Sequence, residues 1–321
     1  MAAIIGIGLA GKDCVVQVEA WERDEKTTAS AYLEQVGGPV PVALMAMARL
    51  GLPQKPLLLS VIGGDPEGEQ VSRWLGEGGI ENAFLQRSGP ETATCKSLVI
   101  LDQRDASRTI VAVAAHLPPL DLEPMRRSFF AATRLLHLDG RDLPASLGAA
   151  TIVRSAGGTV SLDLGTMRPG AEALLPHCDI ILASQTGAAG AFPAVSSLPQ
   201  RQVEEFLKLG ATIAGVTLGK NGVVIGFRRE TRTTVRMLPA ISTPDAVDSC
   251  GAGDTFHGAF LWAYLQGRDP VRCAQFAQAA ASLRIRRLGN RAGMPALDEV
   301  ELLLRSLSPE DAPQESTLST T

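Results

Sequence analysis

The sequence predicts an α/β fold with a doubly wound, mostly parallel sheet flanked by helices. The main observation is an alternation of strand-like and helix-like segments from Leu135 onward, which is typical of parallel βαβ units. A second is size and composition: 321 residues with 45% hydrophobic content are sufficient for one large core or two ordinary domains. A third is a group of half-exposed, strand-like segments nearer the N-terminus that does not fit into such a sheet.

In this N-terminal part, short apolar or alternating runs predict strands, and longer apolar stretches predict helices. The helix expected over 41–50 ends at Gly51, which suits a C-cap. A polar turn at 102–108 separates two β-prone runs and predicts a hairpin. The expected elements are strands at 4–8, 14–19, 29–36 and 57–62, helices at 41–50 and 67–75, and hairpin strands at 96–101 and 109–113.

The remaining elements belong to the alternating part of the chain. Because helical segments separate several of its strands, these strands are expected to form one mostly parallel sheet. The expected strands are at 135–138, 159–163, 180–183, 212–218 and 223–227, with helices at 145–156 and 200–209 among them.

The most informative stretch runs from Val247 to Gly258, where Gly251-Ala252-Gly253-Asp254 stands shortly before an apolar, helix-like run. Glycine allows backbone N–H groups to converge and lets a ligand approach closely. A helix N-terminus adds unpaired N–H donors and a partial positive charge, which suit a phosphoryl group in transit. Asp254, at the edge of this site, can accept the proton of an attacking hydroxyl, as in a kinase that acts on an alcohol.

The same residues have a simpler interpretation, a glycine loop that caps a buried helix with Asp254 as the N-cap. The wider context favours the kinase, because residues 248–254 resemble the Asp-Thr-x-Gly-Ala-Gly-Asp signature of the ribokinase-like (pfkB) family of small-molecule kinases, with Ser249 in place of Thr. Gly37-Gly38 before an apolar run, and the segment 62–68, resemble two further signatures in the family's order. The resemblance covers roughly residues 2–304.

This resemblance implies an ATP-dependent carbohydrate kinase with a ribokinase-like domain over 1–307. Asp254 would be the general base, and Gly251, Ala252 and Gly253 would direct N–H groups at the γ-phosphoryl group. Segments at about 13–36 and 95–113 would form a small β lid over the substrate, which in this family is often shared in a homodimer contact. The polar tail at 308–321 is expected to be disordered.

A possible nucleotide-binding turn follows an apolar strand at Thr217-Leu218-Gly219-Lys220-Asn221-Gly222. The resemblance implies that Thr217 and Gly219 approach the ATP phosphates and ribose, and that Gly222 permits the turn. A plain strand–turn–strand hairpin would use the same residues. The small apolar segment 276–282, which includes Ala280, is expected either to line the adenine pocket or to belong to the core.

Phosphoryl transfer from ATP requires a metal ion that bridges the phosphates, and Mg²⁺ is expected. The family often places Asn-x-x-Glu near this ion, but the matching residues here are Ser184-Gln185-Thr186-Gly187. Asp163 is therefore the candidate carboxylate that would support the magnesium ion through its water ligands. Asp248 stands where the family often binds a monovalent cation, with 289–295 completing the loop, so potassium dependence is a secondary expectation.

Asp13, after a strand, is the best candidate for binding sugar hydroxyls, because a carboxylate can accept two of them. Gly37 and Gly38 would let the sugar approach the backbone. The family frequently has Asn shortly after Gly-Gly, and its replacement by the segment 39–42, Pro-Val-Pro-Val, argues against a plain ribokinase.

Two further resemblances concern the sugar. The segment 137–141, His-Leu-Asp-Gly-Arg, resembles the ketohexokinases, whereas Lys26, Arg141 and the segments 37–39 and 290–295 resemble the bacterial sulfofructose kinases. In the latter, a Lys and an Arg bind the anionic end of the sugar, which implies that Lys26 and Arg141 lie together. The alternatives are a solvated lid charge for Lys26 and an ion pair with a neighbouring aspartate for Arg141. Arg108 is a further candidate, and Ala112 replaces an Asn of that anion site.

A different class of enzyme is suggested by Gly6-Ile7-Gly8-Leu9-Ala10-Gly11, which matches the dinucleotide-binding fingerprint Gly-x-Gly-x-x-Gly. That fingerprint requires a helix to begin within the motif and to hold the pyrophosphate. The residues that follow, 12–18, are β-prone and alternating, so a Rossmann oxidoreductase is disfavoured.

Composition excludes other classes. A net charge of −4 argues against a nucleic-acid partner, which would need a basic face. The five cysteines and four histidines are scattered without metal spacing, as expected for reduced thiols in a cytoplasmic protein. Neither a signal peptide nor a membrane helix is expected.

The predicted function is therefore an ATP- and Mg²⁺-dependent sugar kinase that phosphorylates a primary hydroxyl of a ketohexose or a related sugar, including an anionic one. A nucleoside or other small-alcohol kinase is the alternative within the class. A non-catalytic sugar or nucleotide sensor on the same fold is the alternative outside it, although a sensor would not need the base Asp254.

Overall fold

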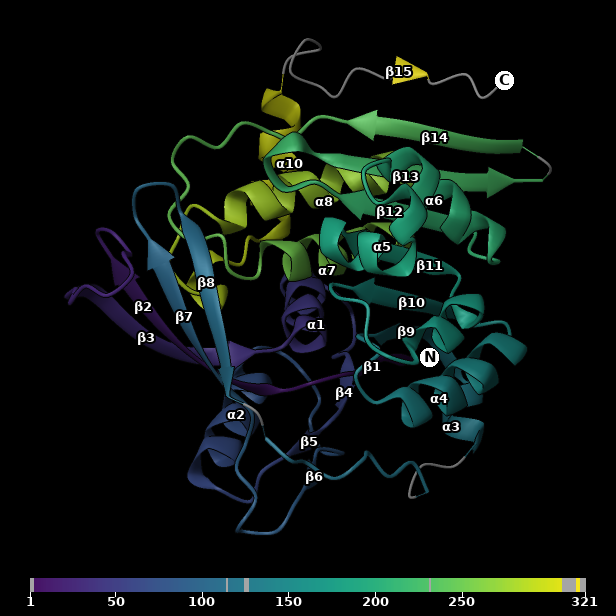
Figure 1. Cartoon of the computed structure of the whole chain (residues 1–321). Helices are drawn as coiled ribbons and strands as arrows, with labels where there is room; N and C mark the ends of the chain where they lie inside the picture. Colours follow the sequence, from purple (N-terminus) through teal and green to yellow (C-terminus); the bar gives the residue numbers. More distant parts are fainter. Residues whose placement is uncertain (1–2, 114, 124–126, 231, 308–315, 318–321) are drawn as a thin grey trace.

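The computed structural model describes residues 3–113, 115–123, 127–230, 232–307 and 316–317. It contains a nine-stranded sheet with helices on both faces and a separate four-stranded sheet beside it (Figure 1). The prediction of an α/β fold with a mostly parallel large sheet is confirmed. The tail expected to be disordered, 308–321, lies outside the described residues except for 316–317.

The strands of the large sheet follow the order β15-β14-β13-β12-β11-β10-β9-β1-β4. Neighbouring strands from β4 to β12 run parallel, and the strands from β12 to β15 pair antiparallel. The bounds are β1 Ala3–Ile7, β4 Leu57–Leu59, β9 Thr133–Leu138, β10 Thr159–Leu164, β11 Ile180–Ser184, β12 Ile213–Thr217, β13 Val223–Arg229, β14 Arg232–Leu238 and β15 Ser316–Thr317. A two-stranded sheet joins β5 Val61–Ile62 to β6 Gln86–Arg87.

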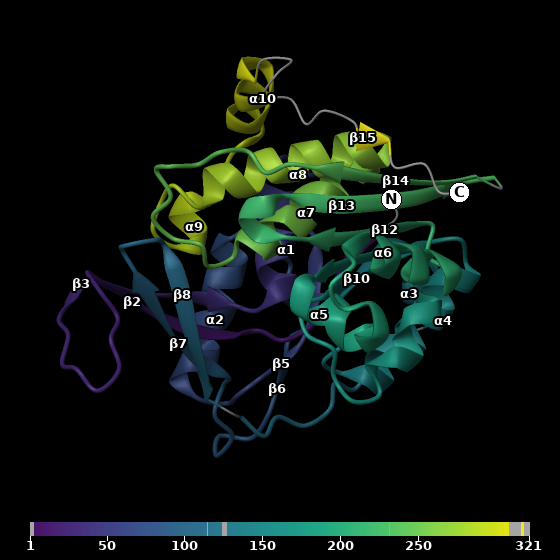
Figure 2. The ribbon, with the colours of Figure 1, turned by 45° about the horizontal axis from the view of Figure 1, so that its top comes forward.

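Helices cover both faces of the large sheet, with α1, α7 and α8 on one face and α4 to α6 on the other (Figures 1 and 2). Alternation of side chains along a buried strand explains this, since successive residues point to opposite faces. Along β11, Ile180 and Leu182 pack in the first core, and Ile181 and Ala183 pack in the second. The bounds are α1 Pro39–Arg49, α2 Pro66–Glu77, α3 Arg127–Ala131, α4 Leu143–Ser155, α5 Gln185–Ala191, α6 Pro199–Lys208, α7 Ala252–Leu265, α8 Pro270–Arg284, α9 Asn290–Gly293 and α10 Leu297–Ser306.

The four-stranded sheet has the order β3-β2-β7-β8 and is formed by the segments that were expected to lie outside the main sheet. Its bounds are β2 Gly11–Val18, β3 Ala29–Gly37, β7 Lys96–Asp102 and β8 Ser107–Val113. The chain enters it from the carboxyl end of β1, so this sheet, here called the lid sheet, stands beside that end of the parallel strands (Figure 1).

The register of the lid sheet defines an inner and an outer face. Gln35, Asp13, Ser97 and Ala112 pair with one another in one row across the four strands. Since side chains alternate, this row shares its face with Val15, Val99 and Leu101. These three pack against Cys250 in the loop before α7, so the inner face is turned toward that loop.

The dinucleotide-like motif holds no helix, because β1 leads through a short turn directly into β2. Its glycines are explained by close packing: a Cβ at Gly6 would overlap Val40 of α1, and one at Gly11 would lie 2.7 Å from the Cys95 carbonyl oxygen. The rejection of a Rossmann oxidoreductase is consistent with this geometry.

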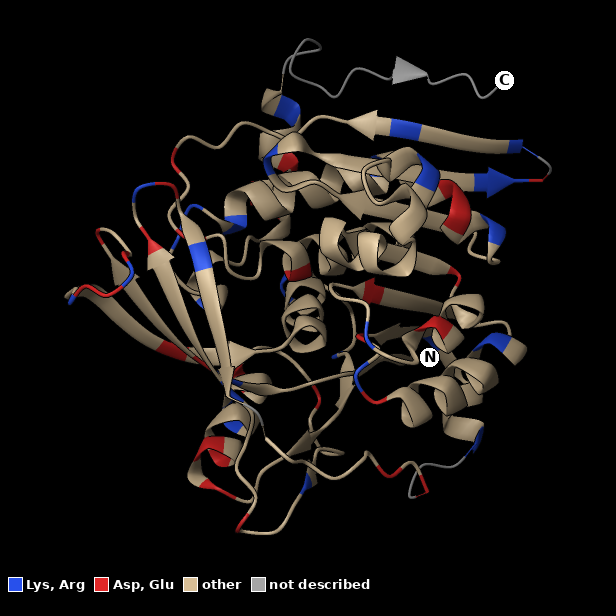
Figure 3. Ribbon diagram, in the orientation of Figure 1, with Lys and Arg blue, Asp and Glu red and all other residues tan. Residues whose placement is uncertain are grey.

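Lys and Arg residues are interspersed with Asp and Glu over the described part of the molecule (Figure 3). Among the described residues, no helix combines the length and the apolarity that crossing a membrane requires.

Candidate active site

Helix α7 begins at Ala252, within residues 249–253, here called the glycine loop, and its N-terminus has no side-chain cap. The N-cap, Gly251, has φ 72°, a left-handed conformation that favours glycine, and a Cβ there would overlap Oδ1 of Asn290. The first turn of a helix leaves its N–H groups without acceptors inside the helix. With the helix dipole added, these groups suit an anion.

Space remains open above this turn at Gly253. A Cβ at Gly253 would meet no atom within 4 Å, and the residue is exposed. The packing of the protein therefore does not require glycine at this position.

Asp254 follows in the same turn and is half-buried. Burial raises the pKa of Asp254 to about 7, and the negative charges of Asp163 and Asp13 add to the increase. A carboxylate with a pKa near the working pH is well suited to accept a proton in the transition state. Asp13 of the lid sheet is thus near enough for its charge to act on Asp254.

Asp13 projects from the inner row of the lid sheet, next to the start of α1. Its carboxylate lies against Gly37, where a Cβ would overlap it, and Gly38 has φ 111°, with its own Cβ position blocked by the Leu9 carbonyl oxygen. Burial raises the pKa of Asp13 to about 6, and a hydrogen bond with Ser97 partly opposes this. The two glycines thus hold the carboxylate close to the backbone at the lid's base.

Arg108 brings a positive charge to the same space. It lies on the inner face of β8, and its Nη1 lies 3.4 Å from Oγ of Ser249 in the glycine loop. Its charge opposes the raised pKa values of Cys250 and Asp254. The structure therefore brings together the glycine loop, Asp254, Asp13 and Arg108, all of which the sequence had indicated.

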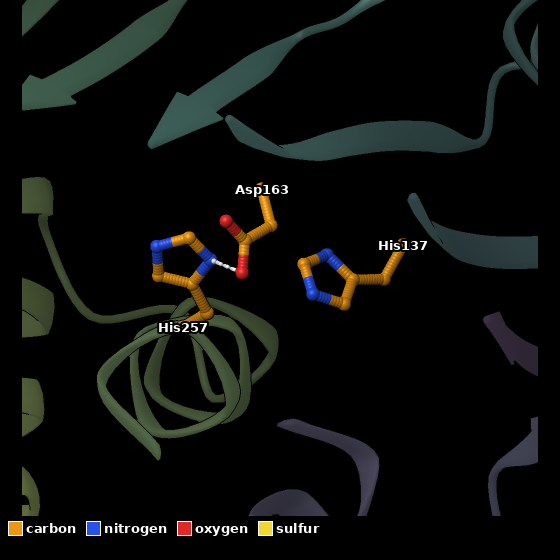
Figure 4. Close-up of side chains that lie close together, drawn as sticks. All are labelled: His137, Asp163 and His257. Carbon is orange, nitrogen blue, oxygen red and sulfur yellow. Dashed lines mark ion pairs between the residues drawn. The ribbon is translucent and has the colours of Figure 1, made fainter. Parts of the chain in front are cut away.

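His137, Asp163 and His257 form a buried polar cluster beside α7 (Figure 4). His257, one turn further along α7, places Nδ1 2.8 Å from Oδ2 of Asp163 on β10, and Nδ1 of His137 on β9 lies 3.3 Å from Oγ of Ser161. Burial alone would lower the pKa of His257 and raise that of Asp163, but the attraction between them reverses both shifts. Burial and the nearby His257 lower the pKa of His137 to about 3, so it is neutral.

Asp163 belongs to this cluster through one of its two carboxylate oxygens. The three side chains place ligand atoms within 4.8 Å of one another. Oδ2 of Asp163 faces His257, and the expected part of Asp163 in supporting a magnesium ion through water stays a prediction. Sequence reasoning missed His257, although its position three residues after Asp254 puts both on one helical face.

The nucleotide turn lies at the carboxyl end of β12. Thr217 donates a hydrogen bond of 3.3 Å to the Ala183 carbonyl oxygen. Gly222 has φ 98° and approaches the Leu238 carbonyl oxygen too closely for a Cβ, whereas Gly219, with φ 56°, faces open space. Ala280 is an exception among the expected contacts, because it is wholly buried in the core on α8 and offers no surface to an adenine.

The position of the missing Asn-x-x-Glu motif has no room for the glutamate. A Cβ at Gly187 would overlap the Leu164 carbonyl oxygen. Ser184 caps α5 by accepting a 3.0 Å hydrogen bond from the Gly187 N–H, and it donates one of 2.7 Å to the Gly165 carbonyl oxygen. This turn therefore presents no carboxylate to a magnesium ion.

The two residues expected at an anionic subsite come from different parts of the fold. Arg141 follows β9, with Nε 3.7 Å from Oδ2 of Asp139, and lines a cavity of about 370 Å³ together with Leu9 and Ser60. Lys26 lies in the loop between β2 and β3 of the lid sheet, whereas Arg141 follows a strand of the large sheet. That the two residues act together at an anionic subsite stays a prediction.

Asp248 differs from its expected role as well. Its fully buried carboxylate accepts hydrogen bonds of 2.8 Å from the N–H groups of Cys250 and Gly289, and Nη2 of Arg284 lies 3.1 Å away. An arginine thus stands where a monovalent cation was expected.

Comparison with known proteins agrees with this geometry. Residues 1–297 match the sequence model of the family described as pfkB family carbohydrate kinase. The chain belongs to this family. It is 28% identical to a ribokinase of Arabidopsis thaliana, over 94% of this chain and 81% of the relative. It is 25% identical to a nucleoside kinase of Methanothermobacter thermautotrophicus, over 92% and 93% of the two chains.

Among solved structures, a ribokinase II homologue from E. coli in complex with ATP and Mg²⁺ has a TM-score of 0.79 at 22% identity, covering 95% of this chain and 99% of the other. This likeness shows the fold. Family membership confirms the prediction of a phosphotransferase with an alcohol group as acceptor. The expected cofactors, ATP and Mg²⁺, agree with those present in the homologous structure.

The raised pKa of Asp254 leads to a prediction for the pH dependence. A base must be ionised to accept a proton, so kcat/KM for the sugar is expected to fall about tenfold per pH unit below about pH 7. Steady-state rates from about pH 5 to about pH 9 would measure this. A rate that stays level down to about pH 5 would contradict a base with this pKa.

Proposed function

We propose that this protein is a cytoplasmic kinase that transfers the γ-phosphoryl group of ATP, with Mg²⁺, to a primary hydroxyl of a ketohexose or a related sugar, including an anionic one. The observation that carries the proposal is the position of Asp254 at the open N-terminus of α7, in a space that Asp13 and Arg108 share. A cytoplasmic location is supported by the five cysteines, all of them free thiols.

In the proposed reaction, Asp13 accepts hydrogen bonds from sugar hydroxyls and orients the reacting one. Asp254 takes the proton of that hydroxyl as its oxygen attacks. The N–H groups at Gly253 and its neighbours stabilise the charge on the transferred group, which bound ATP with Mg²⁺ supplies. Thr217 and Gly219 would hold the nucleotide at the carboxyl end of β12. The ion pair of His257 and Asp163 fixes the helical turn that carries the base.

An anionic sugar is supported by Arg108 on the lid and Arg141 at the end of β9, because guanidinium groups form paired hydrogen bonds with phosphate or sulfonate oxygens. Lys26, in the loop between β2 and β3, makes no hydrogen bond or ion pair with the other described residues that would support an anionic sugar. Ribose or a nucleoside is the second candidate substrate, favoured by the names of the two relatives.

The test is ATP consumption by the purified protein with Mg²⁺ across fructose, fructose phosphates, sulfofructose, ribose, ketodeoxygluconate and nucleosides, with Asp254→Asn in parallel. We expect turnover on a ketohexose or anionic sugar that disappears in the variant. Turnover confined to ribose or nucleosides would select the second candidate. Binding of ATP or a sugar without any turnover would favour a sensor.

We also propose that the lid sheet mediates a homodimer. Its outer face carries apolar side chains that are between 39% and 59% exposed, namely Tyr32, Leu98, Val111 and Val113. An apolar patch of this kind, next to the sheet edges formed by β3 and β8, is typical of a surface that pairs with another chain. A second copy is the occupant that matches a self-complementary apolar face.

Val111→Lys is expected to shift the protein from dimer to monomer, because it places a charge on the apolar face at the edge strand β8. Light scattering coupled to size-exclusion chromatography would measure this. Leu302→Lys, at an apolar position on α10 that is 69% exposed against 50% for Val111, is the control and should leave the mass unchanged. A wild-type protein that is monomeric at assay concentrations would refute the proposal.

A further inference from the structure

Asp248 and Arg284 form a buried ion pair. Both side chains are completely buried, and Nη2 of Arg284 lies 3.1 Å from Oδ2 of Asp248. The other carboxylate oxygen, Oδ1, accepts the Cys250 N–H, and Oδ2 also accepts the Gly289 N–H. Every oxygen of this buried carboxylate therefore has a partner.

Arg284 also ties two loops together. Its Nη1 donates a 3.0 Å hydrogen bond to the Arg287 carbonyl oxygen, and its Nη2 donates one of 2.8 Å to Oδ1 of Asn290. Its Nε has no acceptor among the described residues. The two hydrogen bonds and the ion pair with Asp248 therefore hold the guanidinium in place.

Asn290 continues the connection to the lid sheet. Its N–H donates to Oε1 of Gln35, and its side-chain amide donates a 3.3 Å hydrogen bond to the Val36 carbonyl oxygen. The same Asn290 contacts the position where a Cβ of Gly251 would lie. One buried chain of contacts therefore runs from the base of the lid through Asn290 and Arg284 to the glycine loop.

We propose that Arg284 is a built-in counter-cation for Asp248, which positions the glycine loop against the base of the lid and leaves the kinase independent of monovalent cations. Only the expected effect on kcat rests on the proposed function. The contacts of Asp248 and Arg284 carry the cation independence and the loop positioning. A guanidinium is protonated at every working pH, so its charge is permanent.

Electrostatics exclude a second cation at this carboxylate. A potassium ion that contacts Asp248 would stand within a few ångströms of the guanidinium, and in a buried site that repulsion is weakly screened. It would also have to displace N–H donors, which offer a cation no oxygen ligand. The residues present therefore do not fit a potassium ion.

Arg284 contacts neither reacting atom, so its role is that of a positioning residue. If it fixes the loop whose N–H groups stabilise the transferred phosphoryl group, its loss should lower kcat more than it raises KM for ATP, since the loop acts mainly in the transition state. A displacement of about 1 Å at such a loop can cost about 10²-fold in rate.

The first experiment compares wild-type protein in KCl, NaCl and tetramethylammonium chloride at equal ionic strength, with ATP as its tetramethylammonium salt. The unfolding midpoint and kcat should both be the same in all three salts, with kcat differing by less than about twofold. A severalfold rise in kcat in KCl, or a higher unfolding midpoint in KCl alone, would overturn the proposal. The unfolding midpoint does not depend on turnover, so it decides the matter even if the kinase function is wrong.

The second experiment uses Arg284→Met, which removes the charge and keeps a long side chain. We expect kcat to fall about 10²-fold with little change in KM for ATP, and added K⁺ or guanidinium ion to restore part of the rate. Arg272→Met, on an exposed position of the same helix, is the matched control. Unchanged kcat in Arg284→Met without K⁺ would refute the positioning role. Should this variant fail to fold, Arg284→Lys, which retains a charge, should remain independent of K⁺, and a K⁺ requirement in it would equally refute the proposal.

Discussion

Replacing Asp254 with Asn is expected to lower kcat by about 10²- to 10⁴-fold, because the variant loses the proton acceptor at the edge of the glycine loop. KM for the sugar and for ATP should change little, since Asp13 and the nucleotide turn are untouched. Steady-state kinetics with the best sugar would measure both values. Asp269→Asn, at the N-cap of α8, is the control, because Asn caps a helix as well as Asp does.

Asp254→Asn is also expected to be more stable than the wild type at neutral pH. The pKa of Asp254 is raised from 3.8 to about 7, so the folded protein holds a proton that the unfolded chain releases as the pH rises between these values. The wild type therefore loses stability over this range, whereas Asn, which carries no charge, does not. The difference in unfolding midpoint between Asp254→Asn and the wild type should therefore be larger at about pH 8 than at about pH 4. An equal difference at both pH values would contradict the raised pKa.

Gly253→Ala is expected to lower kcat by about 10²-fold, because the added methyl group fills the open space above the N–H groups of α7. The protein itself has no atom within 4 Å of that methyl group, so folding should be unaffected. Measurement of kcat together with the unfolding midpoint would separate the two effects.

Gly148→Ala is the matched control for Gly253→Ala. Gly148 is also helical and exposed, and a Cβ there meets no atom within 4 Å. Alanine is the better helix former by about 0.5–1 kcal/mol, so this control should be slightly more stable and fully active. Equal kcat values for the two variants would show that no ligand group approaches Gly253.

The fold was predictable because its cause is local. Alternating strand-like and helix-like runs, and a glycine loop joined to an apolar helix, are visible in consecutive residues. The rejection of the Gly6 to Gly11 motif as a dinucleotide site rested on the same kind of observation, since the residues after it favour a strand.

Contacts between distant segments could not be predicted. Arg284 meets Asp248 across 36 residues, and nothing in the segment 284–287, which holds three arginines, indicates which of them is buried. The ion pair of His257 with Asp163 depends on how α7 crosses β10. The role of Lys26 also stays a prediction, since the sequence of a loop does not state in which direction it extends.

The row formed by Gln35, Asp13, Ser97 and Ala112 assigns to each lid strand one position at the floor of the substrate space. These positions lie in the lid sheet, separate from the nine-stranded sheet, so an exchange at Asp13, Ser97 or Ala112 changes the substrate space and leaves the packing of the large sheet in place. Related proteins with this fold can thus acquire a different substrate preference through single substitutions, while the helix that carries Asp254 stays unchanged.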